Sequence, residues 1–517
     1  MDFDMPEQLS LLLQQYKKTG QGVTDNLKAS LTCWDGLNNY LKAFLDPFRT
    51  ALNAFSALET EKLAQVPSWD TFRDYAELLK FNQQIVEKGF NSSVEAMQEY
   101  YLKHFDEACQ VWCNTVYNKD GEDFASFSAR QLKLLKHLVH AYPEAIKNIK
   151  QEYGIHFEDG GYKLEAETDR FYLYQVLPLN AKIKVRKNGK PILIVPPYVL
   201  GPNILAFLPG ERKSYVHAFA DQGIPTYLRF IKDIDTTPAV QTMTGEDDTL
   251  DTRIFCKKLF SKHGKAVSLN GFCQGGFICT LNVLSGKLDG LVDTLITCVS
   301  PMDGTRSISL TEYLKHIPER FKDLGYAVRV LANGNQVVDG KVMSWVYKLK
   351  SMEDEAPIVA FYRDLAMFDR PGAVERPISK TAAAINYWLI YDRNDLPLEI
   401  TKISFASYTI PVAEDGTLPV KLFGKKLNFK HIRKKGINFL MCCAARDDLV
   451  DRESALAPLD FTDAEVTIFP KGHGAIATSW SHPDSECAQH TRFGDNYRGP
   501  VRYHLDMEKE LNGKSDG

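Results

Sequence analysis

The sequence predicts an α/β fold, in which helices flank a mostly parallel sheet, preceded by an all-α region. Over residues 165–505, strand-like apolar runs alternate with helix-like runs, an order typical of parallel sheets with crossover helices. Over residues 1–160, apolar residues instead recur at the helical spacing of three and four. We therefore expect two domains, followed by a short tail at residues 506–517.

Length and composition narrow the class of protein. With 517 residues, the chain can form two domains and a large core. A net charge of −4 without a basic stripe argues against nucleic-acid binding. No run of about 18 apolar residues occurs, so no membrane span is expected. Ten cysteines without paired spacing, and no signal peptide at the start, indicate a cytoplasmic protein with reduced thiols and no metal site.

Residues 1–160 are expected to form the N-terminal helical domain. Apolar residues in Leu9–Tyr16 and in later segments keep a helical period, and such stripes are mainly core. Ser68 and Ser93 each precede a helix-like run and are predicted to be N-caps. The pair Asp120–Gly121 marks a break before another helix.

Strand signals begin in the second domain at Phe171–Val176. The pair Asn188–Gly189 separates the apolar runs Ile183–Val185 and Ile192–Val195, which predicts a β-hairpin. Residues 303–425 interrupt the later strands, and we expect them to form a helical cap over the functional site; an ordinary helical insertion is the alternative. The aromatic residues of this cap insertion include Tyr313, Trp345, Tyr347, Phe361, Tyr362, Phe368, Tyr387 and Trp388.

A glycine-bracketed cysteine is the most informative motif. The segment Asn270–Gly276 follows the apolar run Ala266–Leu269 and precedes the helix-like run Phe277–Leu281. A strand, a Gly-x-nucleophile-x-Gly turn and a helix form the nucleophile elbow of the α/β-hydrolase fold, which places Cys273 as the nucleophile. The helix N-terminus favours the thiolate. The alternative is a buried cysteine that packs beside a tight turn.

The fold requires an acid and then a histidine, each after a later strand. An apolar run ends before a loop that holds three candidate acids, Asp447, Asp448 and Asp451. We select Asp447 because the acid usually precedes an x-Leu-Val pair. The alternating run Glu465–Phe469 ends just before His473. For that histidine taken alone, a hydrogen-bonded residue of a surface loop would be the favoured interpretation.

The same fold logic predicts an oxyanion hole. One donor is the backbone N–H of Gln274, because it follows the nucleophile. The second comes from the loop after Pro196–Pro197, near Val199.

These segments resemble the polyhydroxyalkanoate synthase family. The elbow matches its Gly-x-Cys-x-Gly-Gly, and four more segments resemble family motifs: Ile192–Tyr198, Asn386–Trp388 with Asn394–Pro397, Ala445–Val450 and Gly472–His473. The chain departs from the family at three positions in particular. Tyr198 replaces a tryptophan, Leu389 an asparagine and Asp448 a histidine.

The resemblance covers roughly residues 165–500 and implies an acyltransferase. The expected reaction polymerises (3-hydroxyacyl)-coenzyme A into a polyester and releases coenzyme A through an acyl-cysteine on Cys273, with Asp447 and His473 completing the triad. Coenzyme A belongs to the substrate, so no cofactor is expected. The implied partners are the growing chain, the granule surface and a second copy, with residues 1–160 serving dimerisation and granule association.

Two alternatives stay open from the sequence. The same triad in an open site would make a thioesterase or a polyester depolymerase. A third possibility is a granule-associated protein that does not polymerise.

Overall fold

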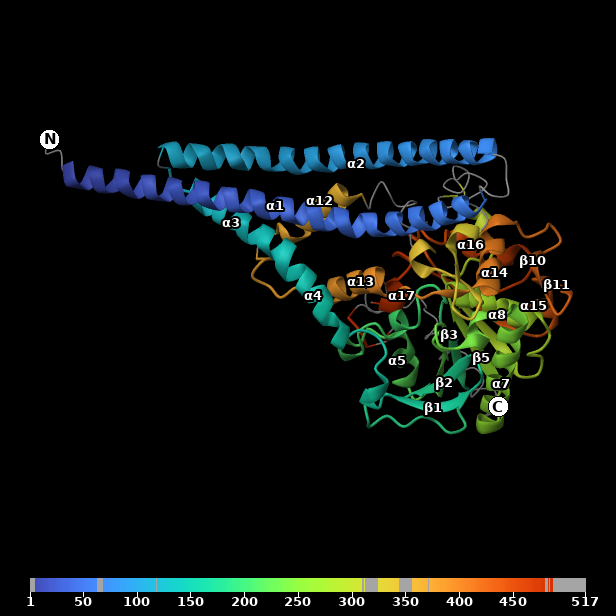
Figure 1. Cartoon of the computed structure of the whole chain (residues 1–517). Coiled ribbons are helices and arrows are strands. Elements are labelled where there is room, and N and C mark those ends of the chain that lie inside the picture. Colours follow the sequence, from blue (N-terminus) through green and yellow to red (C-terminus); the bar gives the residue numbers. More distant parts are fainter. Residues whose placement is uncertain are drawn as a thin grey trace. The chain divides into compact units, whose positions relative to one another are not determined.

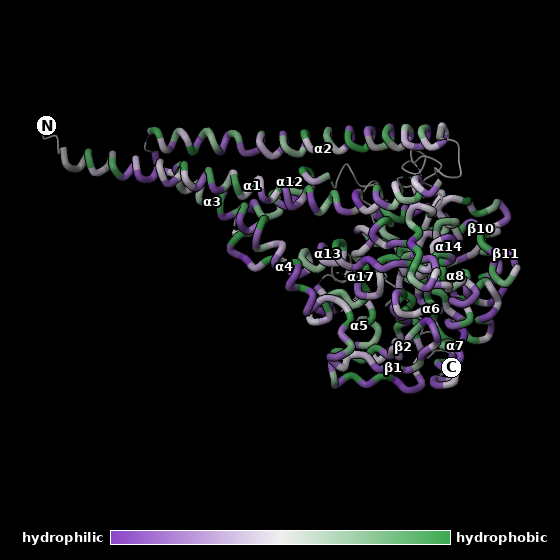
Figure 2. The backbone as a smooth tube through the Cα atoms, viewed as in Figure 1, coloured by the Kyte–Doolittle hydropathy of each residue, from purple (hydrophilic) through white to green (hydrophobic). Residues whose placement is uncertain are grey.

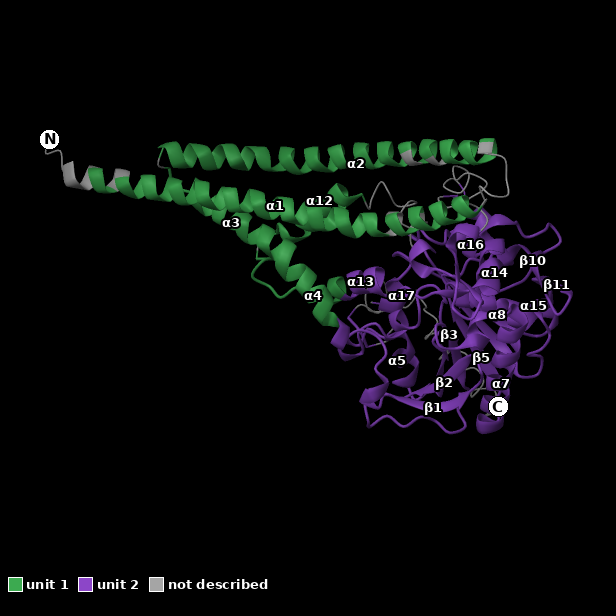
Figure 3. Ribbon diagram, in the orientation of Figure 1, with its two compact units in different colours: residues 1–149, 344–383 green, residues 150–343, 384–517 purple. Residues whose placement is uncertain are grey.

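The computed structural model describes residues 5–62, 68–117, 119–308, 324–343, 356–370 and 372–478, together with residues 311, 482 and 484–486. Internal contacts divide the chain into two compact units (Figure 3). Unit 1 comprises residues 1–149 and 344–383, and unit 2 comprises residues 150–343 and 384–517. Part of the predicted cap insertion therefore groups with the N-terminal helices. The predicted tail at residues 506–517 lies outside the described residues.

Unit 1 is helical. Its helices are α1 (Met5–Lys62), α2 (Ser68–Tyr117), α3 (Phe124–Lys136), α4 (Tyr142–Asn148) and α12 (Pro357–Phe368), with a π-helical segment at His137–Ala141 between α3 and α4. The break predicted at Asp120–Gly121 is confirmed, because α2 ends before it and α3 begins after it. Asp123 caps α3 by accepting a hydrogen bond from the backbone N–H of Ser126.

Two expectations for these helices are wrong. Ser93 is not an N-cap: it lies inside α2, and its hydroxyl donates to the carbonyl of Gly89 one turn back (2.6 Å). This back-bond lets a serine remain within a helix. The apolar stripe of α1 is also not mainly core, since Leu9 and Leu13 are more than half exposed, whereas Leu132 and Leu135 of α3 are buried as expected. Figure 2 shows apolar and polar residues alternating along α1 and α2.

Unit 2 has the α/β-hydrolase fold. Its eight-stranded sheet has the order β1-β2-β4-β3-β5-β6-β12-β13. The pairs β1–β2 and β2–β4 are antiparallel, and all the others are parallel. The strands are β1 (Tyr162–Glu167), β2 (Phe171–Val176), β3 (Ile192–Val195), β4 (Thr226–Ile231), β5 (Val267–Phe272), β6 (Val292–Cys298), β12 (Asn438–Ala444) and β13 (Glu465–Phe469).

Helices cover both faces of this sheet. Figure 1 shows α5 (Tyr215–Ala220) on one side, and α7 (Gly245–His263) and α8 (Gln274–Leu284) on the other. Every residue of β3 and β5 is consequently buried, as expected for strands covered on both faces. A capping box between Thr244 and Asp247 begins α7, and Gly264 ends it in the left-handed conformation.

The hairpin predicted at Asn188–Gly189 is wrong. Only the second of its two runs is a strand, β3, and that strand pairs in parallel with β4 on one side and β5 on the other. No edge of β3 remains for an antiparallel partner. Residues 183–187 form no strand, and the N–H of Arg186 instead donates to the carbonyl of Gly223 (2.9 Å).

In its described residues, the segment between β6 and β12 contains strands as well as the predicted helices. Its described elements in unit 2 include two small antiparallel sheets. One consists of β7 (Val328–Val330), β8 (Gln336–Val338) and β9 (Leu396–Pro397), and the other of β10 (Thr417–Leu422) and β11 (Lys425–Asn428). The helices are α14 (Leu398–Thr409), α15 (Lys430–Lys434) and the part of α13 (Lys380–Tyr391) that follows Ala383. Among the described helices, none combines the length and apolarity needed to cross a membrane.

Candidate active site

Cys273 occupies a strained turn between β5 and α8. Its backbone has φ 52° and ψ −124°, outside the regions that L-residues normally adopt. Such a conformation costs about 1–3 kcal/mol and persists only where the surroundings enforce it. The backbone N–H of Cys273 donates to the carbonyl of Cys298 on β6 (2.8 Å), which helps to hold the turn.

The two elbow glycines are required by close packing. A Cβ on Gly271 would lie 2.3 Å from the Cα of Gly276, and a Cβ on Gly275 would lie 2.3 Å from the carbonyl oxygen of Val195. Both obstacles are backbone atoms, which cannot move aside as a flexible side chain could. The sequence pattern at the elbow therefore has a direct steric cause.

Asp447 and His473 are hydrogen-bonded partners. The Nδ1 of His473 lies 2.8 Å from the Oδ2 of Asp447. The other carboxylate oxygen, Oδ1, accepts the backbone N–H groups of Leu449 (3.0 Å) and Val450 (2.9 Å). The Leu-Val pair that pointed to this aspartate thus supplies two donors that fix its carboxylate.

The neighbouring acidic residues are placed differently. Asp448 is exposed, and Asp451 accepts the backbone N–H of Ile308 through its Oδ2 (2.7 Å). Within the described chain, Asp447 is the carboxylate that is hydrogen-bonded to the ring of His473.

His473 lies between the Asp447 carboxylate and the Cys273 thiol. The ring is buried, and burial alone favours its neutral form. Negative charge on Asp447 and on Cys273 outweighs burial and raises the pKa of His473 well above its ordinary value. The Nε2 atom is buried and makes no hydrogen bond of ordinary geometry with another described residue. This nitrogen is therefore available to the Cys273 sulfur.

The two predicted oxyanion donors lie on neighbouring segments. Gln274 is the first residue of α8, and Val199 belongs to the loop after β3. That loop contacts the side chain of Gln274. The Oε1 atom of Gln274 accepts the backbone N–H of Tyr198 at 3.0 Å and the backbone N–H of Val199 at 3.4 Å. The Val199 N–H therefore has a long hydrogen bond to a protein oxygen, a contact that the sequence did not suggest.

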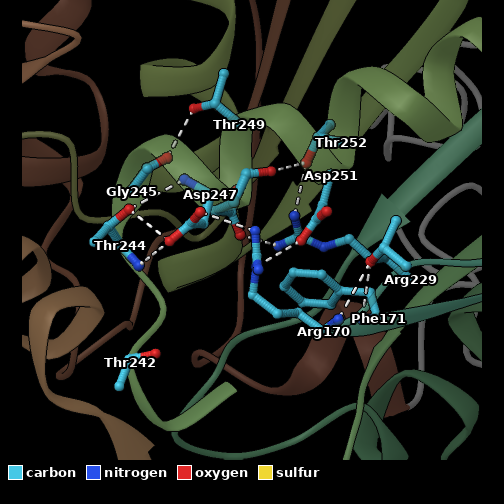
Figure 4. A network of polar contacts seen from close by, with 12 residues as sticks. Arg170, Phe171, Arg229, Thr242, Thr244, Gly245, Asp247, Thr249, Asp251 and Thr252 are labelled. Carbon is cyan, nitrogen blue, oxygen red and sulfur yellow. Dashed lines mark hydrogen bonds and ion pairs between the residues drawn. The ribbon is translucent and has the colours of Figure 1, made fainter. Parts of the chain in front are cut away.

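A buried polar network holds the side chain of Tyr198 in this loop. The Tyr198 hydroxyl donates to Asp248 and accepts from Arg229 (3.1 Å), and Arg229 pairs with Asp248 (2.8 Å). Arg229 also donates to Thr252 (2.7 Å). Figure 4 shows this last contact, together with the adjoining one between Arg170 and Asp251.

This network was not predicted from the sequence. A signal was present, because Arg229 is the only charged residue in the strand sequence Thr226–Ile231. A charge within a buried strand requires a partner, and the partner, Asp248, lies on α7.

The predicted cap aromatics are only partly placed. Tyr313, Trp345 and Tyr347 lie outside the described residues. Phe361, Tyr362 and Phe368 belong to α12 in unit 1. Tyr387 and Trp388 remain in unit 2, where the Trp388 ring N–H donates to the carbonyl of Leu200 (3.4 Å). Trp388 therefore contacts the same loop as Gln274.

Comparison with known proteins shows no family for this chain. No family model and no curated protein matches the chain. Solved structures similar to it include DcsB in complex with its substrate analogue (12% identity, TM-score 0.35), covering 69% of this chain and 100% of that one. Another is the esterase RhEst1 from Rhodococcus sp. ECU1013, with 11% identity and a TM-score of 0.34 over 68% of this chain and 98% of that one. A third is the α/β hydrolase GrgF from Penicillium sp. sh18, with 14% identity and a TM-score of 0.33 over 69% of this chain and 96% of that one.

Proposed function

We propose that the chain is a cysteine-dependent acyltransferase that polymerises (3-hydroxyacyl)-coenzyme A into a polyester. The observation that carries this proposal is the set Cys273, Asp447 and His473. The cysteine occupies a strained elbow after β5, and the histidine is held by an aspartate fixed through two backbone N–H groups. The resemblance to polyhydroxyalkanoate synthases supplies the substrate class.

In the first half of the reaction, His473 accepts the proton of the Cys273 thiol. The raised pKa of His473 favours this transfer, because the imidazolium is stabilised by Asp447. The thiolate attacks the thioester carbonyl, and the backbone N–H groups of Gln274 and Val199 would stabilise the oxyanion. Collapse of the tetrahedral intermediate breaks the carbon–sulfur bond to coenzyme A, which leaves as a thiol with the proton from His473.

In the second half, an alcohol replaces coenzyme A as the reacting partner. The hydroxyl of a second hydroxyacyl group gives its proton to His473 and attacks the acyl-cysteine, so that an ester bond forms and the thiolate is regenerated. Water at the same position would give hydrolysis. Burial of both Cys273 and His473 supports transfer to an alcohol, because a site closed to bulk water limits this side reaction.

The proposal extends to unit 1, which would form a dimer and contact the granule. Helix α1 has an exposed apolar stripe whose members follow steps of three, four or seven: Leu9, Leu13, Tyr16, Val23, Leu27, Leu31, Trp34, Leu41, Leu45 and Leu52. The buried residues between Val23 and Trp34 are small or polar, as at Asp25, Ala29 and Thr32, whereas Phe55 is a large apolar residue that is buried further along the helix. Heptad-like spacing favours another helix as the partner, and so a second copy of the chain.

One experiment tests the reaction. Purified protein is incubated with 3-hydroxybutyryl-coenzyme A, and the thiol released is measured together with the fate of the acyl group. Polymerisation predicts insoluble polyester and little free 3-hydroxy acid. Stoichiometric free acid without polymer, over short and medium acyl chains, would instead establish a thioesterase. No thiol release at all would contradict both.

A further inference from the structure

The side chain of Gln274 connects three separate segments of unit 2. It is buried, and it begins one residue after Cys273 at the start of α8. Its Oε1 accepts the two successive backbone N–H groups of Tyr198 and Val199. Its Nε2 donates a short hydrogen bond to the hydroxyl of Ser404, near the middle of α14.

The chemistry of these contacts suits a carboxamide. Backbone N–H groups only donate, so the oxygen of Gln274 must face the loop. The NH₂ group then points to Ser404. An apolar side chain of similar length could make neither contact, and a carboxylate could accept from both partners only by placing a buried negative charge beside the elbow. Gln274 can thus hold the loop and α14 at the same time.

We propose that the Gln274 carboxamide is a positioning group that sets the second oxyanion donor and makes its placement depend on α14. This inference rests on the proposed function, because it assumes that Val199 serves the oxyanion. The Tyr198 bond, at 3.0 Å, anchors the loop to the elbow helix. The Val199 bond, at 3.4 Å, is long. A charge-assisted bond to an oxyanion is about twice as strong as a neutral one, so this N–H can turn toward the oxyanion when it forms.

Other contacts of the loop explain why Gln274 matters for alignment more than for folding. The Tyr198 hydroxyl is fixed by Asp248 and Arg229, and the Leu200 carbonyl accepts from Trp388. These contacts would keep the loop attached without Gln274. Only the Gln274 contacts join the Tyr198–Val199 amides to the residue that follows the nucleophile.

Four variants separate the contact of Gln274 with the loop from its contact with Ser404 on α14. Gln274→Met keeps the length and removes all polar contacts. Ser404→Ala removes only the contact to α14, and Ser404→Thr restores a hydroxyl. Thr409→Ala is the matched control, because Thr409 is an exposed α14 residue whose hydroxyl bonds only within its own helix, to Phe405. Thermal midpoints are recorded for all four.

Steady-state coenzyme A release and single-turnover acylation of Cys273 are then measured. Because loss of a whole oxyanion donor costs about 10²–10³-fold in kcat, misplacing one should cost less. We expect Gln274→Met to lower kcat about 10- to 100-fold and Ser404→Ala about 3- to 10-fold, with KM changed less than about twofold. Ser404→Thr should return to within about twofold of wild type, and Thr409→Ala should match it.

The same variants are assayed with a p-nitrophenyl acyl ester, which reports acylation of Cys273 whatever the natural donor is. If wild type cleaves this ester but releases no coenzyme A from 3-hydroxyacyl thioesters, the proposed function fails while the role of Gln274 is still tested.

Unchanged kcat in Gln274→Met and Ser404→Ala with both donors would overturn the positioning role. So would a change confined to KM, or a Ser404→Thr variant that stays as slow as the alanine. Inactivity of wild type with both donors would overturn both proposals.

Discussion

Unit 2 buries the apolar residues that its sequence pattern marks as core, whereas unit 1 leaves much of its pattern exposed. The strand β3 is apolar and wholly buried, because neighbours cover both its edges and both its faces. Helix α1 has an equally regular pattern, yet Leu27, Leu31 and Trp34 are each more than 60% exposed. Periodicity therefore predicts which element forms, but not whether this chain supplies its covering partner.

The buried face of α1 sharpens this contrast. A Cβ on Gly22 would lie 2.7 Å from the Phe124 ring of α3, and a Cβ on Gly36 would lie 2.7 Å from a methyl group of Val139. Small residues thus let α1 approach its neighbours inside unit 1 at these two positions, while most of its large apolar residues, though not Phe55, are exposed. In unit 2 the arrangement is the usual one, in which the apolar residues of the strands are buried. The outward stripe therefore requires a partner if it is to be buried.

The largest effect on activity should come from replacing Cys273, the buried elbow residue of unit 2. Cys273→Ala removes the sulfur that would form the acyl-enzyme, so coenzyme A release should become undetectable. Alanine and cysteine have similar backbone requirements at the strained turn, so the fold should survive, as circular dichroism can check. Brief exposure of wild type to substrate should yield an acylated Cys273 peptide in mass spectrometry. Full activity in the alanine variant would remove the proposed nucleophile.

The second effect concerns the choice among neighbouring acids. Asp447→Asn keeps the size of the side chain but removes the charge that raises the pKa of His473 and the acceptor that fixes its tautomer. We expect kcat to fall by about 10⁴-fold, as in other triads, and the pKa of His473 to fall. Asp448→Asn, at an exposed position, should change kcat less than about threefold. The reverse ranking would mean that the acid is one residue further on.

The third effect tests how far unit 2 depends on its buried polar network. Arg229→Met removes one member of a buried ion pair and leaves the Asp248 carboxylate without its counter-charge. Such a loss costs about 3–5 kcal/mol of the free energy of unfolding, measurable by urea denaturation. Lys435→Met is the control, since its partner Asp289 is largely exposed, and surface pairs contribute about 0–1 kcal/mol. Equal losses in both variants would show that burial of the pair has no special weight.

The sequence predicted the α/β-hydrolase fold because its evidence was local. The elbow glycines, the strand before Cys273 and the Leu-Val pair after Asp447 all lie within a few residues of the feature that they predict. The failures required information from distant segments. The hairpin at Asn188–Gly189 failed because β3 finds parallel partners far along the chain, and no local pattern showed that Gln274 would meet Ser404, 130 residues away.

The smallest effect belongs to the exposed unit and decides what its pattern is for. If a second copy covers the α1 stripe, then Leu27→Glu combined with Trp34→Glu should weaken dimerisation, because charges would enter a helix interface. Burial of these two side chains contributes about 1.5–3 kcal/mol each, so the dissociation constant should rise at least about tenfold in sedimentation velocity. Asn26→Glu is the control, at an exposed polar position of the same helix.

A wild-type chain that stays monomeric at micromolar concentration but binds polyester particles through these residues would assign the stripe to the granule. In that case the period of α1 would reflect an apolar surface and not a second helix, and the contrast between the two units would be one between a core and a docking face.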